Sequence, residues 1–387
     1  MNHPPSNAPG HLLILTWPVH IPGGVNEAVL GLALQLQARG YRPTVGVTSW
    51  SKDPQPAETR GIEVVSLGLR EPLSQEAGLR LLPGFLRTLL PDSRALLALL
   101  RDRNIQVVNS HFPSLNVVIV MMLKALGLYW GKLVLTFHGA DIGEISRCTG
   151  LVRRAWQVLI RRADGVVACS DALRREVLQF APQARVTTIH NGADIGLFNG
   201  IVRTPPAAIR RILHVGKFEH KKSQDVILRA FKRLLETHPD CSLVLIGGFG
   251  PSLEETRVLI AELGLQKQVE MHVNVPHDQL PEFMSRADLF ILPSRSEPFG
   301  IVLLEAGAAG LPVIATRVGG IPELLEHERT GLLIAPDSVE ELEQAMRRLI
   351  ENPELAGGLG RRWHEHVVAT WNWDVTCQKY LKMVEQI

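Results

Sequence analysis

Short apolar runs alternate with segments of helical periodicity along the whole chain. The first run, HLLILTW (11–17), fits one buried strand, and an amphipathic segment, NEAVLGLALQLQARG, follows it after a Pro-Gly-Gly turn. Further strands are predicted at 43–49, 62–67, 105–110, 132–137, 165–170 and 186–190. Continuous apolar strands separated by helices are typical of a parallel sheet covered on both faces. The pattern therefore predicts an α/β, doubly wound domain over residues 11–195.

The pattern restarts after the polar, proline-containing stretch NGIVRTPPAA. Strands are predicted at 211–218, 241–248, 268–273, 287–294 and 312–317, which indicates a second doubly wound domain. We expect the first domain over 1–204 and the second over 205–362. The remaining segment, 363–387, is predicted to be helical, with packing back on the first domain as one option. Ligands of such domains bind at the carboxyl ends of the strands.

Composition narrows the class of protein. The 41 basic and 39 acidic residues nearly cancel, so the charge gives no reason to expect nucleic acid as a partner. The four cysteines lie far apart and suit reduced thiols in the cytosol. The first ten residues are unlike a signal peptide, and no uncharged apolar stretch approaches the roughly 20 residues of a membrane helix. We expect a cytoplasmic enzyme, and the sequence does not indicate its oligomeric state.

The stretch PSRSEPFGIVLLEA (293–306) carries the strongest chemical signal. Pro298 disfavours helical geometry at Glu297, which should therefore stand in a loop, whereas Glu305 falls in the first turns of the following helix. The amides at that helix start are potential donors to a diphosphate; they belong to Gly300, Ile301 and Val302. Two carboxylates repel phosphates and suit the hydroxyls of a ribose and a sugar instead. The alternative is a capped helix with ordinary surface glutamates.

Lysines and glycines follow predicted strands in other loops of the chain. Lys217 and Lys222 follow the strand LHVG, where they can neutralise a diphosphate and stabilise it as it departs. Lys221 competes for this role, and a solvated lysine cluster is the alternative. Gly23 and Gly24 follow the first strand and would let the backbone approach a phosphate, or would simply make a tight turn.

Two histidines end strands of the first domain. His138 follows KLVLTF, and His111 follows IQVVNS with the same topology, so both are candidate ligand-binding residues at the carboxyl edge of the first sheet. Asp141 is a third candidate in the loop of His138, or it caps the next helix. A structural histidine is the alternative for His138. No catalytic triad and no metal-ligand cluster emerges from the pattern.

In these motifs the chain resembles the retaining glycosyltransferases of family 4, which have the GT-B architecture of two Rossmann-like domains facing a cleft. Glu297 and Glu305 match the family's two glutamates separated by seven residues. The resemblance implies that Glu305 holds the ribose hydroxyls, that Glu297 contacts the donor sugar near the reacting centre, and that His138 is functionally important. The family usually has arginine where Lys217 stands and glycine where Ser223 stands.

The resemblance also implies a nucleotide-sugar site in the second domain and an acceptor site in the first. His138 would then contact the transferred sugar or the acceptor, and His111 and Asp141 would line the acceptor side. Further donor-side residues are placed by the resemblance in loops of the second domain: Gly250, Val275, Phe299 and Gly320. The implied reaction moves a hexose-type sugar, with retained configuration, from a nucleotide-diphosphate donor to a hydroxyl. UDP-sugars are preferred over GDP-mannose on frequency within the family. No metal or other cofactor is implied.

From the resemblance we expect the acceptor to be a glycan, a lipid-linked molecule or a small molecule, in bacterial polysaccharide or glycolipid synthesis. The stretch 81–103 alternates leucines with arginines, which suits either a helix packed on the sheet or peripheral contact with the inner face of a membrane. Two other function classes stay open: a sugar-nucleotide epimerase or hydrolase of the same fold, and a non-catalytic sugar-nucleotide-binding protein.

Overall fold

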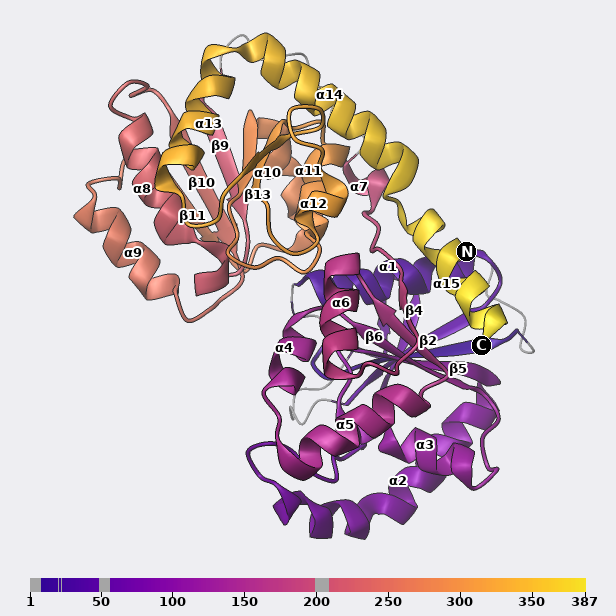
Figure 1. The fold of residues 1–387 in the computed structure, drawn as a ribbon. Coiled ribbons are helices and arrows are strands. Elements are labelled where there is room, and N and C mark those ends of the chain that lie inside the picture. The colour runs from indigo at the N-terminus through magenta and orange to yellow at the C-terminus, as the bar shows by residue number, and fades with distance from the viewer. Residues whose placement is uncertain (1–7, 20, 22, 49–55, 199–208) are drawn as a thin grey trace. The chain divides into compact units, whose positions relative to one another are not determined.

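The structure is a computed structural model that describes residues 8–19, 21, 23–48, 56–198 and 209–387. The chain divides into two compact units. Unit 1 comprises Met1–His190 and Trp373–Ile387, and unit 2 comprises Asn191–Asn372. Each unit is built on one sheet with helices on both faces (Figure 1). The predicted α/β class with two doubly wound domains is confirmed.

The sheet of unit 1 has eight strands in the order β3-β4-β2-β1-β5-β6-β7-β8, and all its described pairs are parallel except β3 with β4. The strands are β1 Gly10–Leu15, β2 Arg42–Val47, β3 Glu58–Thr59, β4 Ile62–Ser66, β5 Ile105–His111, β6 Lys132–Phe137, β7 Gly165–Ala168 and β8 Val186–Thr188. The helices are α1 Gly24–Ala38, η1 Leu79–Leu81, α2 Leu82–Asp102, η2 Leu115–Val117, α3 Val118–Ala125, α4 Ala140–Ser146, α5 Gly150–Arg162, α6 Asp171–Phe180 and α15 Trp373–Gln386. Every residue of β1 is buried, as expected for a strand covered on both faces.

The last helix, α15, belongs to unit 1 and packs on α1. A Cβ atom at Gly31 of α1 would lie 2.2 Å from the Trp373 ring, so glycine permits this close approach. Farther along α15, the hydroxyl of Tyr380 lies 3.4 Å from Nδ1 of the buried His11 in β1.

The sheet of unit 2 has six strands, all parallel, in the order β11-β10-β9-β12-β13-β14. The strands are β9 Arg211–Val215, β10 Ser242–Gly247, β11 Val269–Val273, β12 Leu289–Leu292, β13 Val313–Thr316 and β14 Leu332–Ile334. The helices are α7 Ile195–Phe198, η3 His220–Lys222, α8 Gln224–Leu234, α9 Leu253–Glu262, η4 His277–Gln279, α10 Leu280–Arg286, α11 Ile301–Ala308, α12 Ile321–Leu324, α13 Val339–Glu351 and α14 Pro353–Thr370.

Helix α14 packs on α11 within unit 2. The indole nitrogen of Trp363 donates to the carbonyl of Leu303 at 3.0 Å, and Gly307 leaves room for that indole. The stretch 363–387, which the sequence presents as one terminal segment, is thus divided between the end of α14 in unit 2 and α15 in unit 1.

Helix α2 is amphipathic and exposes Leu86, Leu90, Arg87 and Arg94. Contact of this face with a membrane stays a prediction. Among the described residues, no helix is both long and apolar enough to cross a bilayer.

Candidate functional site

The loops that follow β9 and β12 bring Lys222 and Glu297 together at the carboxyl edge of the unit 2 sheet. Lys222 Nζ lies 2.5 Å from Glu297 Oε2, and their side chains are 15% and 9% exposed. The hydroxyl of Ser294 lies 3.5 Å from the same carboxylate oxygen. A charge pair this far removed from water needs both members, because either charge alone would be uncompensated. The sequence assigns these residues separate tasks, whereas the structure makes them partners.

The glycine loop after β13 holds the backbone of Glu297. The amide of Gly320 donates to the Glu297 carbonyl at 3.0 Å. Gly319 has φ 53°, and a Cβ atom there would lie 2.0 Å from the same carbonyl oxygen. Both the left-handed backbone and the close approach require glycine at position 319. This contact gives the Gly319-Gly320 pair a structural role beside the predicted one at the diphosphate.

Helix α11 starts after Gly300, which has φ 101° and serves as its N-cap residue. The first amides of a helix have no carbonyl partner inside it, and those of Ile301 and Val302 are in this position. The neighbouring side chain of Phe299 is 2% exposed and its ring lies 6.0 Å from that of Trp371. Phe299 is thus buried as a whole and packs near Trp371, and its predicted contact with the donor stays a prediction.

Glu305 lies one turn into α11 and pairs with a residue that the sequence does not single out. Its Oε1 lies 2.8 Å from Nε2 of His277 in η4, and the two side chains are 6% and 13% exposed. Position is the signal that would have found His277, because it follows the end of β11 at the same edge of the sheet. Val275 lies two residues before it in the same loop.

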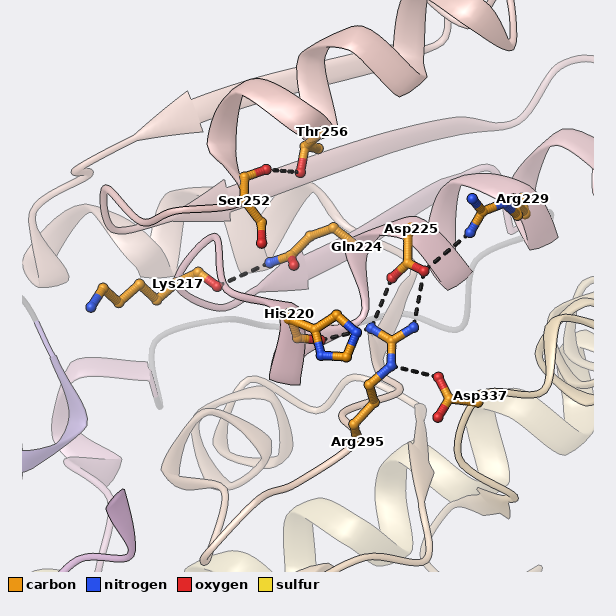
Figure 2. Close-up of polar contacts among 9 residues, drawn as sticks. All are labelled: Lys217, His220, Gln224, Asp225, Arg229, Ser252, Thr256, Arg295 and Asp337. Atoms are coloured by element: carbon orange, nitrogen blue, oxygen red, sulfur yellow. Dashed lines mark hydrogen bonds and ion pairs between the residues drawn. The ribbon is translucent and has the colours of Figure 1, made fainter. Parts of the chain in front are cut away.

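The remaining lysines of the predicted diphosphate site share one carboxylate. Glu219 accepts Lys217 Nζ at 2.6 Å and Lys221 Nζ at 2.8 Å. Burial raises the pKa of Glu219, but hydrogen bonds from the two lysines outweigh it and hold that pKa below its usual value. The Lys217 side chain is half-exposed and extends away from the side chain of Arg295 (Figure 2). Of the three lysines, Lys222 is thus the one held at Glu297.

The glycine-rich loop after β10 lies against the loop after β9. A Cβ atom at Gly250 would lie 2.2 Å from the carbonyl oxygen of Phe218. The amide of Phe249 donates to Asn274 Oδ1 at 2.9 Å, which ties this loop to the one that carries Val275. Gly250 is therefore needed for loop packing, whatever it contributes to a nucleotide.

In unit 1, His111 and His138 form a pair at the ends of β5 and β6. His111 Nδ1 lies 3.1 Å from His138 Nε2, with the rings stacked at 5.3 Å between centroids. Burial lowers the pKa of His138 to about 4, and burial together with the neighbouring imidazole lowers the pKa of His111 well below its usual value. Both rings are thus neutral near pH 7, and one of the two facing nitrogens donates a hydrogen bond to the other.

Asp141 supports the loop that carries His138. Its carboxylate accepts the backbone amides of His138 at 2.8 Å, Gly139 at 2.7 Å and Ile142 at 2.9 Å. Burial raises the pKa of Asp141 to about 6, although these hydrogen bonds oppose the shift. The side chain is 1% exposed and faces the backbone, which favours the capping alternative over contact with an acceptor.

Gly23 and Gly24 begin α1. Gly23 has an extended backbone, and a Cβ atom there would meet no described atom within 4 Å. The side-chain amide of Asn26 holds the preceding loop by donating to the carbonyls of Pro18, Val19 and Ile21. Packing among the described residues therefore does not dictate glycine at position 23, which leaves open space beside the backbone for a ligand.

Comparisons with known protein families cover most of the chain. Residues 22–197 match the family described as "Glycosyltransferase Family 4", and residues 206–364 match "Glycosyl transferases group 1". A GDP-mannose-dependent alpha-(1-6)-phosphatidylinositol monomannoside mannosyltransferase from Mycobacterium tuberculosis is 31% identical over 64% of this chain and 68% of its own length. A glycogen synthase from the same organism is 30% identical over 64% of this chain, and the match spans 63% of that relative's length.

Solved structures share the fold. A sucrose-phosphate synthase from Thermosynechococcus elongatus superposes with a TM-score of 0.79 at 23% identity, covering 98% of each chain. HepE of Anabaena, determined in complex with UDP-glucose, superposes with a TM-score of 0.76 at 20% identity, covering 98% of this chain and all of HepE. The family resemblance and the GT-B fold that the sequence predicts are both confirmed.

Proposed function

This chain belongs to glycosyltransferase family 4, and we propose that it is a retaining hexosyltransferase acting on a nucleotide-diphosphate sugar. The proposed donor is a UDP-sugar, with GDP-mannose as the second choice. The names of similar proteins support both donors as candidates. HepE was determined with UDP-glucose, and the mycobacterial mannosyltransferase depends on GDP-mannose.

The observation that carries the proposal is the arrangement of opposite charges around the start of α11. Lys222 is paired with Glu297 before the helix, and Glu305 lies within it beside His277. A diphosphate at the helix start would draw Lys222 toward itself and leave Glu297 to hydrogen-bond the sugar hydroxyls. Glu305 can then accept hydrogen bonds from the ribose, which gives each carboxylate a neutral hydroxyl as its ligand.

The proposed step is a front-face displacement at the anomeric carbon. The bond from that carbon to the diphosphate oxygen breaks, and the bond to the acceptor oxygen forms on the same face of the sugar. The departing diphosphate takes the proton of the acceptor hydroxyl, and Lys222 with the helix amides stabilises its charge. Glu297 orients and supports the sugar without attacking it.

The acceptor is proposed to bind in unit 1, where the neutral pair of His111 and His138 offers hydrogen bonds to uncharged hydroxyls. A glycan, a lipid-linked molecule or a small hydroxyl compound in bacterial polysaccharide or glycolipid synthesis fits this chemistry. No metal or other cofactor takes part in the proposed reaction.

A donor screen tests the proposal. Thermal shifts with UDP, GDP and ADP, followed by their sugars, should reveal one stabilising nucleotide, because a ligand that binds the folded state raises the melting temperature. The free nucleotide diphosphate should be released from the sugar only when a hydroxyl acceptor is present. Release without an acceptor would favour hydrolysis, and isomerised donor would favour epimerisation. Full turnover by Glu297→Gln with unchanged donor binding would refute the role of Glu297.

A further inference from the structure

Arg295 connects the two loops that carry Lys222 and Glu297. Its guanidinium forms two parallel hydrogen bonds with Asp225, from Nη1 to Oδ1 and from Nη2 to Oδ2, both at 2.9 Å. Figure 2 shows this group between Asp225 and Asp337, and Nε donates to Asp337 Oδ1 at 2.5 Å. One side chain thus joins the start of α8 to the loop before α13.

The same residue holds η3, the short helix that contains Lys222. Nη1 of Arg295 donates to the carbonyl of His220 at 2.7 Å, and the backbone amide of Arg295 donates to the carbonyl of Lys221 at 2.9 Å. Two consecutive carbonyls of η3 are therefore fixed immediately before Lys222. The guanidinium does not lie at the surface, because the side chain is 17% exposed.

Arginine suits this task better than lysine does. Two carboxylates and a carbonyl surround a planar group whose N–H directions are fixed, so the orientation of the loop follows from the orientation of the guanidinium. The hydrogen bonds that Arg295 donates to Asp225 and Asp337 raise the pKa of its guanidinium. A lysine would offer one point charge and no planar fork, so it could not reproduce the two parallel hydrogen bonds to Asp225.

Arg229 provides an internal reference for a purely local ion pair. It also contacts Asp225, at 3.1 Å and four residues away on α8, but its side chain is half-exposed. Pairs of this kind contribute a few tenths of a kcal/mol to helix stability. Arg295 differs because its partners lie on three separate segments, one of which ends in Lys222.

We propose that Arg295 is a positioning residue, which fixes Lys222 for contact with the donor diphosphate without touching the donor itself. The inference rests on the proposed function, since it assumes that Lys222 binds the diphosphate. Loss of the guanidinium would let η3 shift relative to Glu297, so that part of the diphosphate contact would be lost. A merely structural arginine would instead change stability and leave the binding of nucleotide by the folded protein unchanged.

The test compares Arg295→Gln with Arg229→Gln, which removes one arginine from the same carboxylate. Dissociation constants for UDP and GDP are measured by calorimetry, together with melting temperatures and, with a transferred sugar, kcat and KM. We expect Arg295→Gln to weaken binding of the accepted nucleotide by about 10-fold, and Arg229→Gln by less than about 2-fold. Arg295→Lys should recover only part of the loss, and it replaces Arg295→Gln if that variant does not fold.

A double-mutant cycle with Lys222→Ala shows whether Arg295 acts through the lysine. In that background Arg295→Gln should cost less than about 2-fold further, because the group it positions is gone. Equal losses in both backgrounds, or unchanged binding by Arg295→Gln, would overturn the inference. If Lys222→Ala alone left nucleotide binding intact, the proposed diphosphate site would fail instead, so the two failures are distinguishable.

Discussion

The carboxyl edges of the two sheets follow the same topological rule but carry opposite chemistry. At the unit 2 edge, charged side chains neutralise one another, as Lys222 does with Glu297 and as Lys217 and Lys221 do with Glu219. At the unit 1 edge, His111 and His138 face each other as neutral rings, and burial holds the pKa of each below its usual value. The unit 2 edge thus carries ion pairs, whereas the unit 1 edge carries two neutral imidazoles.

The difference indicates which kind of ligand each edge can accept. When an ion pair lies inside the protein, the attraction between its two charges offsets part of the cost of removing them from water. An anionic ligand can then replace the carboxylate as the partner of the lysine. Once the two neutral imidazoles are hydrogen-bonded to each other, the pair has one N–H donor and one acceptor nitrogen left, and it has no charge to attract an anion. We therefore expect the anionic part of a substrate to bind unit 2 and an uncharged hydroxyl to bind unit 1.

The largest effect should come from Lys222→Ala. Removing this cation leaves Glu297 buried without its partner and the diphosphate without its cation, so kcat/KM for the donor should fall by about 10²-fold to 10³-fold. Lys221→Ala is the matched control, because it removes an adjacent lysine whose partner is Glu219. Its kcat/KM should change by less than about 3-fold, as expected for an exposed charge. Comparable losses in the two variants would mean that the pairing with Glu297 does not identify the functional lysine.

An intermediate effect is expected on stability in unit 1. Burial raises the folded-state pKa of Asp141 to about 6 from 3.8, so its contribution to stability is complete below pH 3.8 and is lost as the pH rises through 6. His138 has the opposite sign: its folded-state pKa falls from 6.5 to about 4, so its contribution is present above pH 6.5 and is lost as the pH falls through 4. The two contributions oppose each other between pH 4 and 6.

Asp141→Asn should remove the contribution of the buried acid and leave that of His138. Without the buried acid, the free energy of unfolding should fall more steeply than in the unchanged protein between pH 6 and 4, by up to about 3 kcal/mol. Urea unfolding at a series of pH values measures the difference. Parallel curves for the two proteins would show that Asp141 titrates alike in the folded and unfolded states.

The two edges also differ in how far the sequence predicts them. Glu297, Glu305, Lys222 and His138 are predictable because each follows an apolar strand, and parallel strands end at one edge of a sheet. Which of the residues at the strand ends pair with one another is not predictable in this way. The Lys222–Glu297 pair joins residues 75 positions apart, and the contacts of His277 and Arg295 depend on how separate loops pack.

The sequence pattern also fails to predict two short strands of the fold. Strand β3 has two residues, too few for any periodicity, and it is absent from the predicted pattern, as is the three-residue β14. The division of residues 363–387 between α14 and α15 was likewise hidden, because both segments are helical. What separates them is their packing, on α11 through Trp363 and on α1 through Trp373.

The smallest effect concerns Glu219, which holds Lys217 and Lys221 in the same way that Glu297 holds Lys222. If internal carboxylates compete with the diphosphate for these lysines, Glu219→Gln should strengthen nucleotide diphosphate binding by about 3-fold at low salt, and the gain should shrink as salt screens the charges. Glu340→Gln is the matched control, since it removes an equal charge from unit 2 where the partner is Arg233 on α8. Calorimetry with UDP and GDP at two salt concentrations measures both variants. Weaker binding by Glu219→Gln alone would mean that Glu219 orients the lysines rather than competing for them, and the balance of charges at this edge would then be part of the binding site itself.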